Sequence, residues 1–555
     1  MNDTLLMAIG LIVAVVLLII AMDLYSRYKL RKRIAFEWGK KPAWSRLDNE
    51  DSLKEAWRLA QTYQQADSVV DDMTWNDLDM FQLFEAINAT YSSVGSEALY
   101  QQLRNFDFDE HAADRLEELI AFYERHPETR KKVQFGFAQL GKKDNNFVKH
   151  YLSTTDGKEL PHLYIYVTLG LLPFAGLLFL ILGQVAGIVL MLASICFNTV
   201  YYMIKKETLE RELNCMRYFV RTLSTAKDLG KLETPVQQLL KEYLAPLKGI
   251  LSFGFSFRTK SNSEADIIFD YINMALMLPF ISYNFVLKRL ANHRKEAIAL
   301  WDILGKLEIA YAVLNFRQYM PHICSPVFAK GGITAVESYH PLLEKEAVAN
   351  PIDWQKNTLV TGSNASGKST YVRSIAINCI LAQTINTAAA KELTMERGHV
   401  LTSMAVEDNL FEGDSYFVAE IKSIKRVLDQ VRLGQRNYCF IDEILKGTNT
   451  VERIAASASI IDWLKSYPSL AYVATHDIEL TEILKHSCEN VHFEERVQEE
   501  GISFDYLLKP GAAKTRNALK LLEVMDYPAE VVTVAKSEAH FFDQYRTWNA
   551  LAPSE

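Results

Sequence analysis

The chain has 555 residues, of which 49% are hydrophobic and 23% are charged, and its formal net charge is −8. A chain of this length folds as several domains, and its hydrophobic content excludes a mainly disordered protein. Because the net charge is negative, the whole molecule does not attract nucleic acid, and any contact with DNA has to come from a local basic patch.

The first predicted element is a membrane helix near the N-terminus. Residues 5–21 carry no charge and, together with Met22, reach the length that crosses the hydrocarbon core of a bilayer. The basic cluster Arg27–Arg33 places the following residues in the cytoplasm and the N-terminus outside. A cleaved signal peptide would begin with basic residues, whereas this chain begins Met-Asn-Asp-Thr, so we expect the helix to remain as an anchor.

A second apolar tract predicts a membrane hairpin. Residues 160–204 are interrupted only by His162, and at about 1.5 Å per residue they measure about two bilayer crossings. A turn at Gly183-Gln184 gives two spans, 163–182 and 185–204, and Lys205-Lys206 marks the return to the cytoplasm. We therefore expect a multi-pass protein of the cell membrane with three transmembrane helices and a cytoplasmic C-terminal part. The alternative is a helical hairpin buried in a soluble core.

The pattern of apolar residues changes at about Ile333. Residues 50–150 and 205–320 carry apolar residues at helical spacing, which predicts bundle segments, and Met274–Leu287 is expected to be a core helix. After Ile333, short β-branched runs alternate with helical stretches, which is typical of an α/β domain. The predicted fold is multidomain: an N-terminal transmembrane helix (1–33), an α-helical core or lever domain in two parts (34–160 and 207–325), the transmembrane hairpin between them (161–206), and a C-terminal α/β P-loop domain (326–555).

A glycine-rich loop is the main functional motif. Gly362–Ser369 fits G-x-x-x-x-G-K-[ST] and follows the strand-like run Asn357–Thr361. Backbone N–H groups of such a loop cradle phosphates, Lys368 can reach the β and γ oxygens, and Ser369 can hold Mg²⁺. A glycine turn that binds nothing is the alternative. The predicted nucleotide-binding residues are Gly362, Ser363, Asn364, Ala365, Ser366, Gly367, Lys368, Ser369 and Thr370.

Two later strands end in residues that suit phosphate chemistry. Tyr438–Ile441 is followed by Asp442, predicted to orient Mg²⁺, and by Glu443, predicted to polarise the attacking water. A strand that simply ends in surface acids is the alternative. The strand Leu470–Thr475 is followed by His476, which can contact the γ-phosphate, although a lone histidine is usually structural. The predicted catalytic residues are Lys368, Glu443 and His476, and the predicted metal ligands are Ser369 and Asp442.

In chain order these motifs resemble the ABC-type ATPase domain of the MutS family. The similar segments are 348–351, 362–373, 413–420, 442–450 and 474–480, with 340–341, 511–513 and 527–531 as flanking elements, and 72–104 resembles the start of the family's helical core domain. The resemblance implies ATP and Mg²⁺ as cofactors, a homodimer, DNA as a partner, and Asn350 as a nucleotide-binding residue. It also implies that Ser415 reaches the γ-phosphate of the partner subunit.

The chain departs from the family pattern at several positions. Ser363, Ala365 and Ser366 replace Pro, Met and Gly, residues 445–446 replace Gly-Arg, and Ala347 stands where an aromatic residue often packs on adenine. Only about fifty residues separate the first helix from Asp71, so we expect no mismatch-reading domain. The predicted function is a membrane-anchored MutS-like ATPase that grips DNA through helical arms. An ABC-type ATPase that serves transport or membrane remodelling with a non-DNA partner is the alternative.

Overall fold

The computed structural model describes residues 3–43, 48–143, 147–153, 159–256, 271–404, 416–498, 501–513 and 518–548. Their contacts divide the chain into two compact units, which are named here the helical unit and the α/β unit. The helical unit comprises Met1–Ala66, Phe84–Gln102 and Glu110–Tyr319, and the α/β unit comprises Asp67–Leu83, Leu103–Asp109 and Met320–Glu555. The domain limits predicted from the sequence remain predictions. The two units group the chain differently from those limits.

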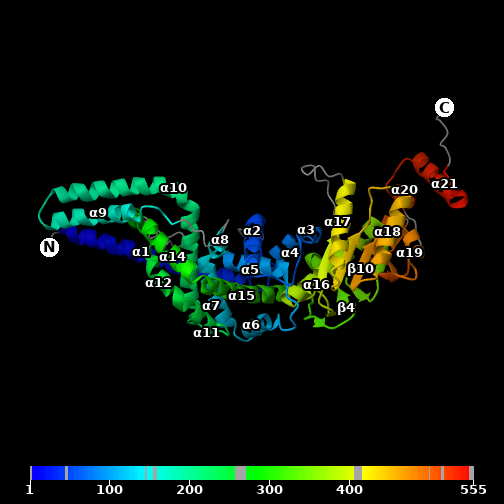
Figure 1. Ribbon diagram of the computed structural model, residues 1–555, viewed down its shortest axis with the longest axis horizontal. Coiled ribbons are helices and arrows are strands. Elements are labelled where there is room, and N and C mark those ends of the chain that lie inside the picture. The colour runs from blue at the N-terminus through cyan, green and yellow to red at the C-terminus, as the bar shows by residue number, and fades with distance from the viewer. Residues whose placement is uncertain are drawn as a thin grey trace, which may run out of the picture. The chain divides into compact units, whose positions relative to one another are not determined.

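The helical unit is organised around one long helix, α15 (Arg294–Tyr319) (Figure 1). The later part of this helix is buried on nearly all sides. The helix packs against α6, α7, α8, α11 and α14. A helix that is apolar on most sides belongs in the interior of a bundle, and the run Ile309–Leu314 of α15 is buried without interruption. The other helices of the unit are α1 (Asp3–Glu37), α2 (Glu50–Gln61), α6 (Asp114–Arg125), α7 (Pro127–Leu140), α8 (Val148–Ser153), α11 (Gln237–Leu244), α12 (Lys248–Leu251) and α14 (Leu278–Asn292), with most of α5 (Ser93–Arg104).

The predicted hairpin is present as α9 (Leu163–Ile181) and α10 (Ala186–Leu229), which lie side by side (Figure 1). Small residues allow this approach, since a Cβ atom added at Gly176 would lie 2.6 Å from the Met191 nitrogen. α10 continues through Lys205-Lys206 without a break, and its later part packs on α7 and α11.

The apolar side chains of this hairpin are mostly exposed. Within the described residues α9 and α10 are the two helices with the length and composition to cross a membrane, and in each only 22% of the apolar window is buried. This exposure favours a membrane hairpin over a helical hairpin buried in a soluble core. The N-terminal helix α1 is not one of these two candidates, so the first of the three predicted spans remains a prediction.

The segment predicted as one core helix, Met274–Leu287, is broken. Helical residues 271–275 are followed by Met277, whose φ of +55° lies in the left-handed region, and α14 starts at Leu278 with Pro279 in its first turn. Proline is tolerated there because a first-turn N–H has no helical partner. Phe280 then packs between Tyr166 of α9 and Tyr202 of α10, with ring centroids 5.1 and 4.9 Å away.

The α/β unit is built on a six-stranded sheet with the order β14-β11-β6-β10-β9-β8. All neighbours in it are parallel except β14 and β11. A four-stranded sheet, β3-β7-β4-β5, and the hairpin β12-β13 complete the unit. The strands are β3 (Val327–Phe328), β4 (Ile333–Ser338), β5 (Asn350–Trp354), β6 (Thr358–Thr361), β7 (Glu392–Met395), β8 (His399–Ser403), β9 (Asn437–Asp442), β10 (Ser469–Ala474), β11 (Glu489–His492), β12 (Glu495–Gln498), β13 (Gly501–Phe504) and β14 (Lys509–Pro510).

The two faces of the six-stranded sheet carry different cores. Successive side chains of a strand point to opposite faces. On one face, Phe440 and Tyr472 pack on Trp354 of β5, at 5.2 Å between ring centroids in each pair, and Tyr472 also contacts Tyr371 of α16. On the other face an aliphatic cluster packs under helices that follow β8, β9 and β10. The helices of this unit are α16 (Lys368–Ile385), α17 (Tyr416–Val431), α18 (Thr450–Leu464), α19 (Glu479–Ile483), α20 (Ala518–Val524) and α21 (Ala529–Tyr545).

Two N-terminal segments belong to the α/β unit. They form β1 (Ser68–Val69), β2 (Asn105–Phe106), α3 (Asp72–Asp77) and the start of α4 (Met80–Ile87). The sequence assigned them to the helical region 34–160, but α3 packs on β8 and β2 packs against α16. Helical spacing in a sequence indicates a helix without indicating which distant strand the helix contacts.

Candidate nucleotide-binding site

The glycine loop joins the central strand β6 to helix α16. A short 3-10 turn, Asn364–Ser366, lies inside the loop, and glycines stand on either side of it. Gly362 and Gly367 have φ values of +136° and +99°, which favour glycine. A Cβ atom at Gly362 would also lie 2.6 Å from the Phe493 carbonyl oxygen, so this position has no space for a side chain.

Lys368 is the first residue of α16, and its ammonium group lies inside the loop. The side chain is buried, and Nζ donates to the carbonyl oxygens of Gly362 at 2.7 Å and Ser363 at 2.8 Å. Burial lowers the lysine pKa to about 8, although the negative charges of Asp442 and Glu443 oppose the shift. Phosphate oxygens can replace the two carbonyl oxygens as acceptors, and their negative charge would favour the protonated amine.

The predicted metal ligands offer the oxygen atoms that Mg²⁺ prefers. Ser369 and Asp442 are half-buried and offer a hydroxyl and a carboxylate oxygen, and Mg²⁺ in nucleotide sites takes one or two such protein ligands together with phosphate oxygens. Asp442 ends β9 and acts electrostatically on Lys368, so both groups belong to one site. Among the residues that the structure describes, no three His, Cys, Asp or Glu side chains form a metal site by themselves.

Glu443 follows β9 in a conformation that is uncommon for this residue type. Its φ is +58°, and its backbone N–H donates to the Ala474 carbonyl oxygen at 2.9 Å. Such backbone strain occurs often at functional sites, where the surroundings hold it in place. The carboxylate contacts His476 at 3.0 Å and Lys446 at 3.3 Å. Burial alone would raise its pKa, but the hydrogen bond from His476 and the charge of Lys446 lower it to about 2.

His476 is held against this carboxylate by its own loop. The next residue, Asp477, makes a bidentate pair with Arg453 of α18, with distances of 2.8 and 2.6 Å. The Asp477 backbone N–H donates to the Thr475 hydroxyl at 3.0 Å. The structure therefore brings two of the predicted catalytic residues, Glu443 and His476, into direct contact through Nε2 and Oε1.

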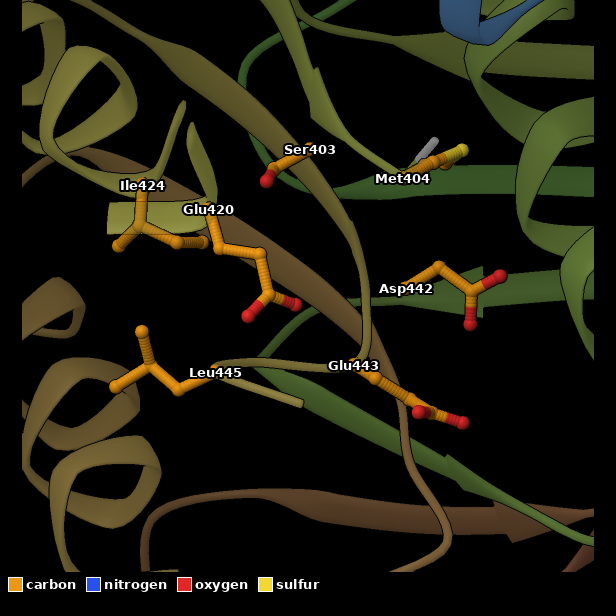
Figure 2. Close-up of a pocket in the computed structure, with 7 residues that line it drawn as sticks. All are labelled: Ser403, Met404, Glu420, Ile424, Asp442, Glu443 and Leu445. Atoms are coloured by element: carbon orange, nitrogen blue, oxygen red, sulfur yellow. The ribbon is translucent and has the colours of Figure 1, made fainter. Parts of the chain in front are cut away.

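A small pocket lies beside the two acids (Figure 2). Glu420 of α17 is buried in it, and its two carboxylate oxygens accept the backbone N–H groups of Lys446 and Gly447, both at 3.1 Å. This contact fixes the turn that follows the acids. The residues that line the pocket are Ser403, Met404, Glu420, Ile424, Asp442, Glu443 and Leu445.

Asn350 lies at the site but contacts protein backbone. Its side chain donates to the Tyr506 carbonyl oxygen at 2.9 Å and accepts the Leu508 N–H at 2.7 Å. Tyr506 stands beside the loop, since a Cβ atom at Gly367 would lie 3.0 Å from the tyrosine ring. The ring is 43% exposed and stacks on Phe504 with a centroid distance of 5.8 Å. Sequence reasoning missed Tyr506, because no local pattern links it to a loop about 140 residues earlier.

Two predicted nucleotide contacts lie outside the part of the chain that the structure describes. Ser415 lies outside the described residues, and so does the side chain of Asn364. Ala365 and Thr370 are exposed on the loop and on the first turn of α16, while Ser366 is buried. The nucleotide-binding assignments of all these residues remain predictions.

Comparison with known proteins gives one family. Residues 358–543 match the profile of MutS domain V, a range that contains the glycine loop, both acids and His476. The chain is 30% identical over 257 residues to human "MutS protein homolog 4", covering 42% of this chain and 27% of that protein. It is 28% identical over 251 residues to "DNA mismatch repair protein MutS" of Thermus thermophilus, covering 44% and 30%. The match thus spans less than a third of either relative.

Proposed function

We propose that this chain, whose residues 358–543 match MutS domain V, is a MutS-like, Mg²⁺-dependent ATPase that works as a membrane-anchored homodimer. The observation that carries this proposal is the arrangement of Lys368 inside the glycine loop with Glu443 and His476 in contact at neighbouring strand ends. The parallel order β6-β10-β9 brings these residues to one edge of the sheet.

The proposed reaction assigns one task to each group. The backbone of the glycine loop binds the phosphates, Lys368 neutralises charge on the β and γ oxygens, and Ser369 and Asp442 hold Mg²⁺. When bound, Mg²⁺ supplies Lewis-acid stabilisation of the developing phosphate charge. Glu443 is ionised at neutral pH because its pKa is about 2, and a carboxylate with so low a pKa orients water better than it removes a proton.

We assign His476 to the support of this carboxylate. Its Nε2 lies 3.0 Å from Glu443, and Asp477 and Arg453 fix the loop that carries it. The same imidazole is exposed at the edge of the sheet, which leaves it able to contact the γ-phosphate. His476 thereby links the water-orienting group to the nucleotide.

Tyr506 is the proposed contact for the adenine base. Ala347 has no ring, whereas the Tyr506 ring lies beside Gly367 and remains half exposed. Stacking of a base on an aromatic ring contributes about 1–3 kcal/mol. Asn350, which bonds the backbone on both sides of Leu507, holds Tyr506 in place.

A second copy of the chain is the proposed partner of the C-terminal helices. Val532 is the buried residue of α21 among those described there, whereas Val531, Val534 and Tyr545 are exposed. Apolar side chains left exposed on a helix mark a surface that another chain can cover. We assign Ser415 to the partner's nucleotide, so hybrids of Ser415→Ala and Lys368→Ala protein should recover part of the activity that each variant lacks.

The membrane and DNA assignments have separate support. The exposed apolar surface of α9 and α10 supports insertion in the cell membrane. The basic residues at Arg27–Arg33 and Lys205-Lys206 support an N-terminus outside and an ATPase domain in the cytoplasm. DNA as the partner is supported by the names of the relatives alone. Binding of the protein to duplex, branched and single-stranded DNA should be independent of sequence and fall steeply with salt. No binding at low salt to any of these would favour the non-DNA partner instead.

The ATPase assignment is tested by two substitutions. Glu443→Gln should keep ATP binding and lower turnover about 100-fold or more, whereas Lys368→Ala should also lose phosphate affinity. Turnover is measured by phosphate release, and binding by fluorescence of a labelled nucleotide. Equal hydrolysis by the wild type and both variants would refute the assignment.

A further inference from the structure

A buried carboxylate on α3 supports one wall of the nucleotide site. Asp77 is 2% exposed, and its Oδ2 accepts hydrogen bonds from the Thr402 hydroxyl at 2.6 Å and from the Met404 backbone N–H at 3.0 Å. These partners lie 325 and 327 residues further along the chain, within the same α/β unit. A carboxylate is costly to bury, so a buried carboxylate that accepts two hydrogen bonds is a specific contact.

The other polar atoms of Thr402 are also held. Its backbone N–H donates to the Thr74 hydroxyl of α3 at 3.2 Å, and its carbonyl oxygen accepts from the Arg426 guanidinium of α17. Arg426 in turn pairs with Asp71, whose carboxylate caps the N-terminus of α3. All three polar groups of Thr402 are therefore fixed by α3 or by a residue bound to α3.

The end of β8 lies directly beside the acids of the site. Ser403 pairs with Ile441, the residue before Asp442, and Ser403 and Met404 line the same pocket as Asp442 and Glu443 (Figure 2). Asp77 thus contacts a pocket-lining residue directly through the N–H of Met404. A displacement of about 1 Å in the surroundings of reacting groups can lower a rate by about 100-fold.

We infer that Asp77 is a positioning residue for hydrolysis, acting through Thr402 and Met404 on the wall beside Asp442 and Glu443. This inference rests on the proposed ATPase function. Because the Asp77 carboxylate accepts hydrogen bonds from Thr402 and Met404 at the end of β8, beside Asp442 and Glu443, it supports the hydrolytic end of the site.

Helix α3 lies shortly before the point where the chain enters the helical unit. Helix α4 begins at Met80, three residues after Asp77, and runs from the α/β unit into the helical unit, which starts again at Phe84. The chain therefore passes from the α/β unit into the helical unit a few residues after Asp77. Asp77 lies at the start of this connection.

The test compares four variants of the full chain in detergent. Asp77→Ala removes the oxygen that accepts both bonds, Asp77→Asn keeps one oxygen that can accept both, and Thr402→Val removes only the hydroxyl donor. Asn76→Ala is the matched control, because Asn76 is exposed on the same helix. The readouts are kcat, KM for ATP, and the number of nucleotide sites, titrated with a fluorescent ATP analogue so that activity refers to folded protein.

Asp77→Ala should lower kcat per site about tenfold and leave KM within about twofold, since the affected wall lies beside the acids. Thr402→Val should lower kcat by about threefold, and Asp77→Asn should restore most of the activity. Asn76→Ala should match the wild type. A structural contribution alone would reduce the number of sites while kcat per site stayed unchanged, and that result would overturn the inference.

Two further outcomes separate the positioning role of Asp77 from the proposed ATPase function. If Asp77→Ala yields no folded protein, Thr402→Val decides, and an unchanged kcat per site in that variant would overturn the inference. If the wild type hydrolyses ATP no faster than Glu443→Gln, the proposed ATPase function has failed. Hydrolysis by the wild type together with wild-type kcat in Asp77→Ala would reject the positioning assignment alone.

Discussion

With the proposed ATPase function, the lowered pKa of Lys368 predicts that ATP binding weakens as pH rises. Burial lowers the pKa of this ammonium group to about 8 in the free protein, and phosphate oxygens of a bound nucleotide would favour the protonated form. Below pH 8 the amine is protonated with or without nucleotide, so affinity is constant. Above pH 8 the free protein loses the proton while the complex keeps it, so binding takes up a proton and weakens as pH rises.

The expected size follows from the pKa of about 8. Each pH unit above this value should weaken binding about tenfold until the pKa of the complex is reached, so the Kd for ATP should rise about 30-fold from pH 7 to pH 9.5. Binding is measured with the wild-type protein and a non-hydrolysable ATP analogue, because the charge of Glu443 contributes to the Lys368 pKa. The fluorescence titration is done at constant Mg²⁺ and ionic strength. The slope of log Kd against pH gives the number of protons taken up.

Lys368→Arg is the matched control for this prediction. A guanidinium stays charged across the whole range, so this variant should bind more weakly at pH 7 but show a flat profile to pH 9.5. A flat profile in the protein with Lys368 would refute the reasoning about its pKa. An equal slope in both proteins would assign the pH dependence to another group.

Three other predictions concern separate parts of the molecule. Tyr506→Ala should raise KM for ATP about tenfold with little change in kcat, whereas Tyr506→Phe should match the wild type, both measured by steady-state hydrolysis. Asn198→Leu should lower the free energy of unfolding in detergent by about 2 kcal/mol. The reason is that the Asn198 carboxamide donates to the carbonyl oxygens of Leu169 and Ala275, both at 2.7 Å. Thr199→Ala is the control variant. Glu308→Ala should cost about 3 kcal/mol by urea denaturation, because the buried carboxylate accepts the backbone N–H groups of Tyr91 and Ser92, whereas Glu308→Gln should cost less.

The Asn198 prediction depends on two backbone carbonyls without a usual helical partner. The Leu169 carbonyl would bond the N–H four residues later, but that residue is Pro173, which has none. The Ala275 carbonyl stands where the helix breaks before Met277. Unpaired carbonyl groups are costly in apolar surroundings, so one carboxamide from α10 stabilises two interruptions of neighbouring segments.

The sequence predicted those parts of the site whose geometry is set by neighbouring residues. The strand–glycine loop–helix unit at 357–369 is present as β6 and α16, and the predicted strands before Asp442 and His476 are present as β9 and β10. In each case a run of β-branched or aromatic residues is followed by glycine or by polar residues. A short segment of sequence is therefore enough to predict both the strand and its end.

The supports of the site could not be predicted in this way. Asp77 and Thr402, or Asn350 and Leu508, are ordinary polar residues within their own segments, and only the folded chain brings them together across 325 and 158 residues. Helical spacing likewise indicated a helix at residues 72–77 but not its contact with β8. Periodicity reports which face of an element is buried and does not report against what.

Three of the departures from the family pattern make polar contacts in the structure. Ser366, in place of glycine, donates to the Ser363 carbonyl oxygen at 2.7 Å, and Ser363, in place of proline, donates to the Glu495 carboxylate of β12. Lys446, in place of arginine, lies 3.3 Å from Glu443 and helps to lower the pKa of that carboxylate. These three replacements each make a polar contact inside the site: two hold the loop where the family pattern has glycine or proline, and the third contacts the Glu443 carboxylate. This compensation is the reason to expect that the altered loop still binds and hydrolyses nucleotide.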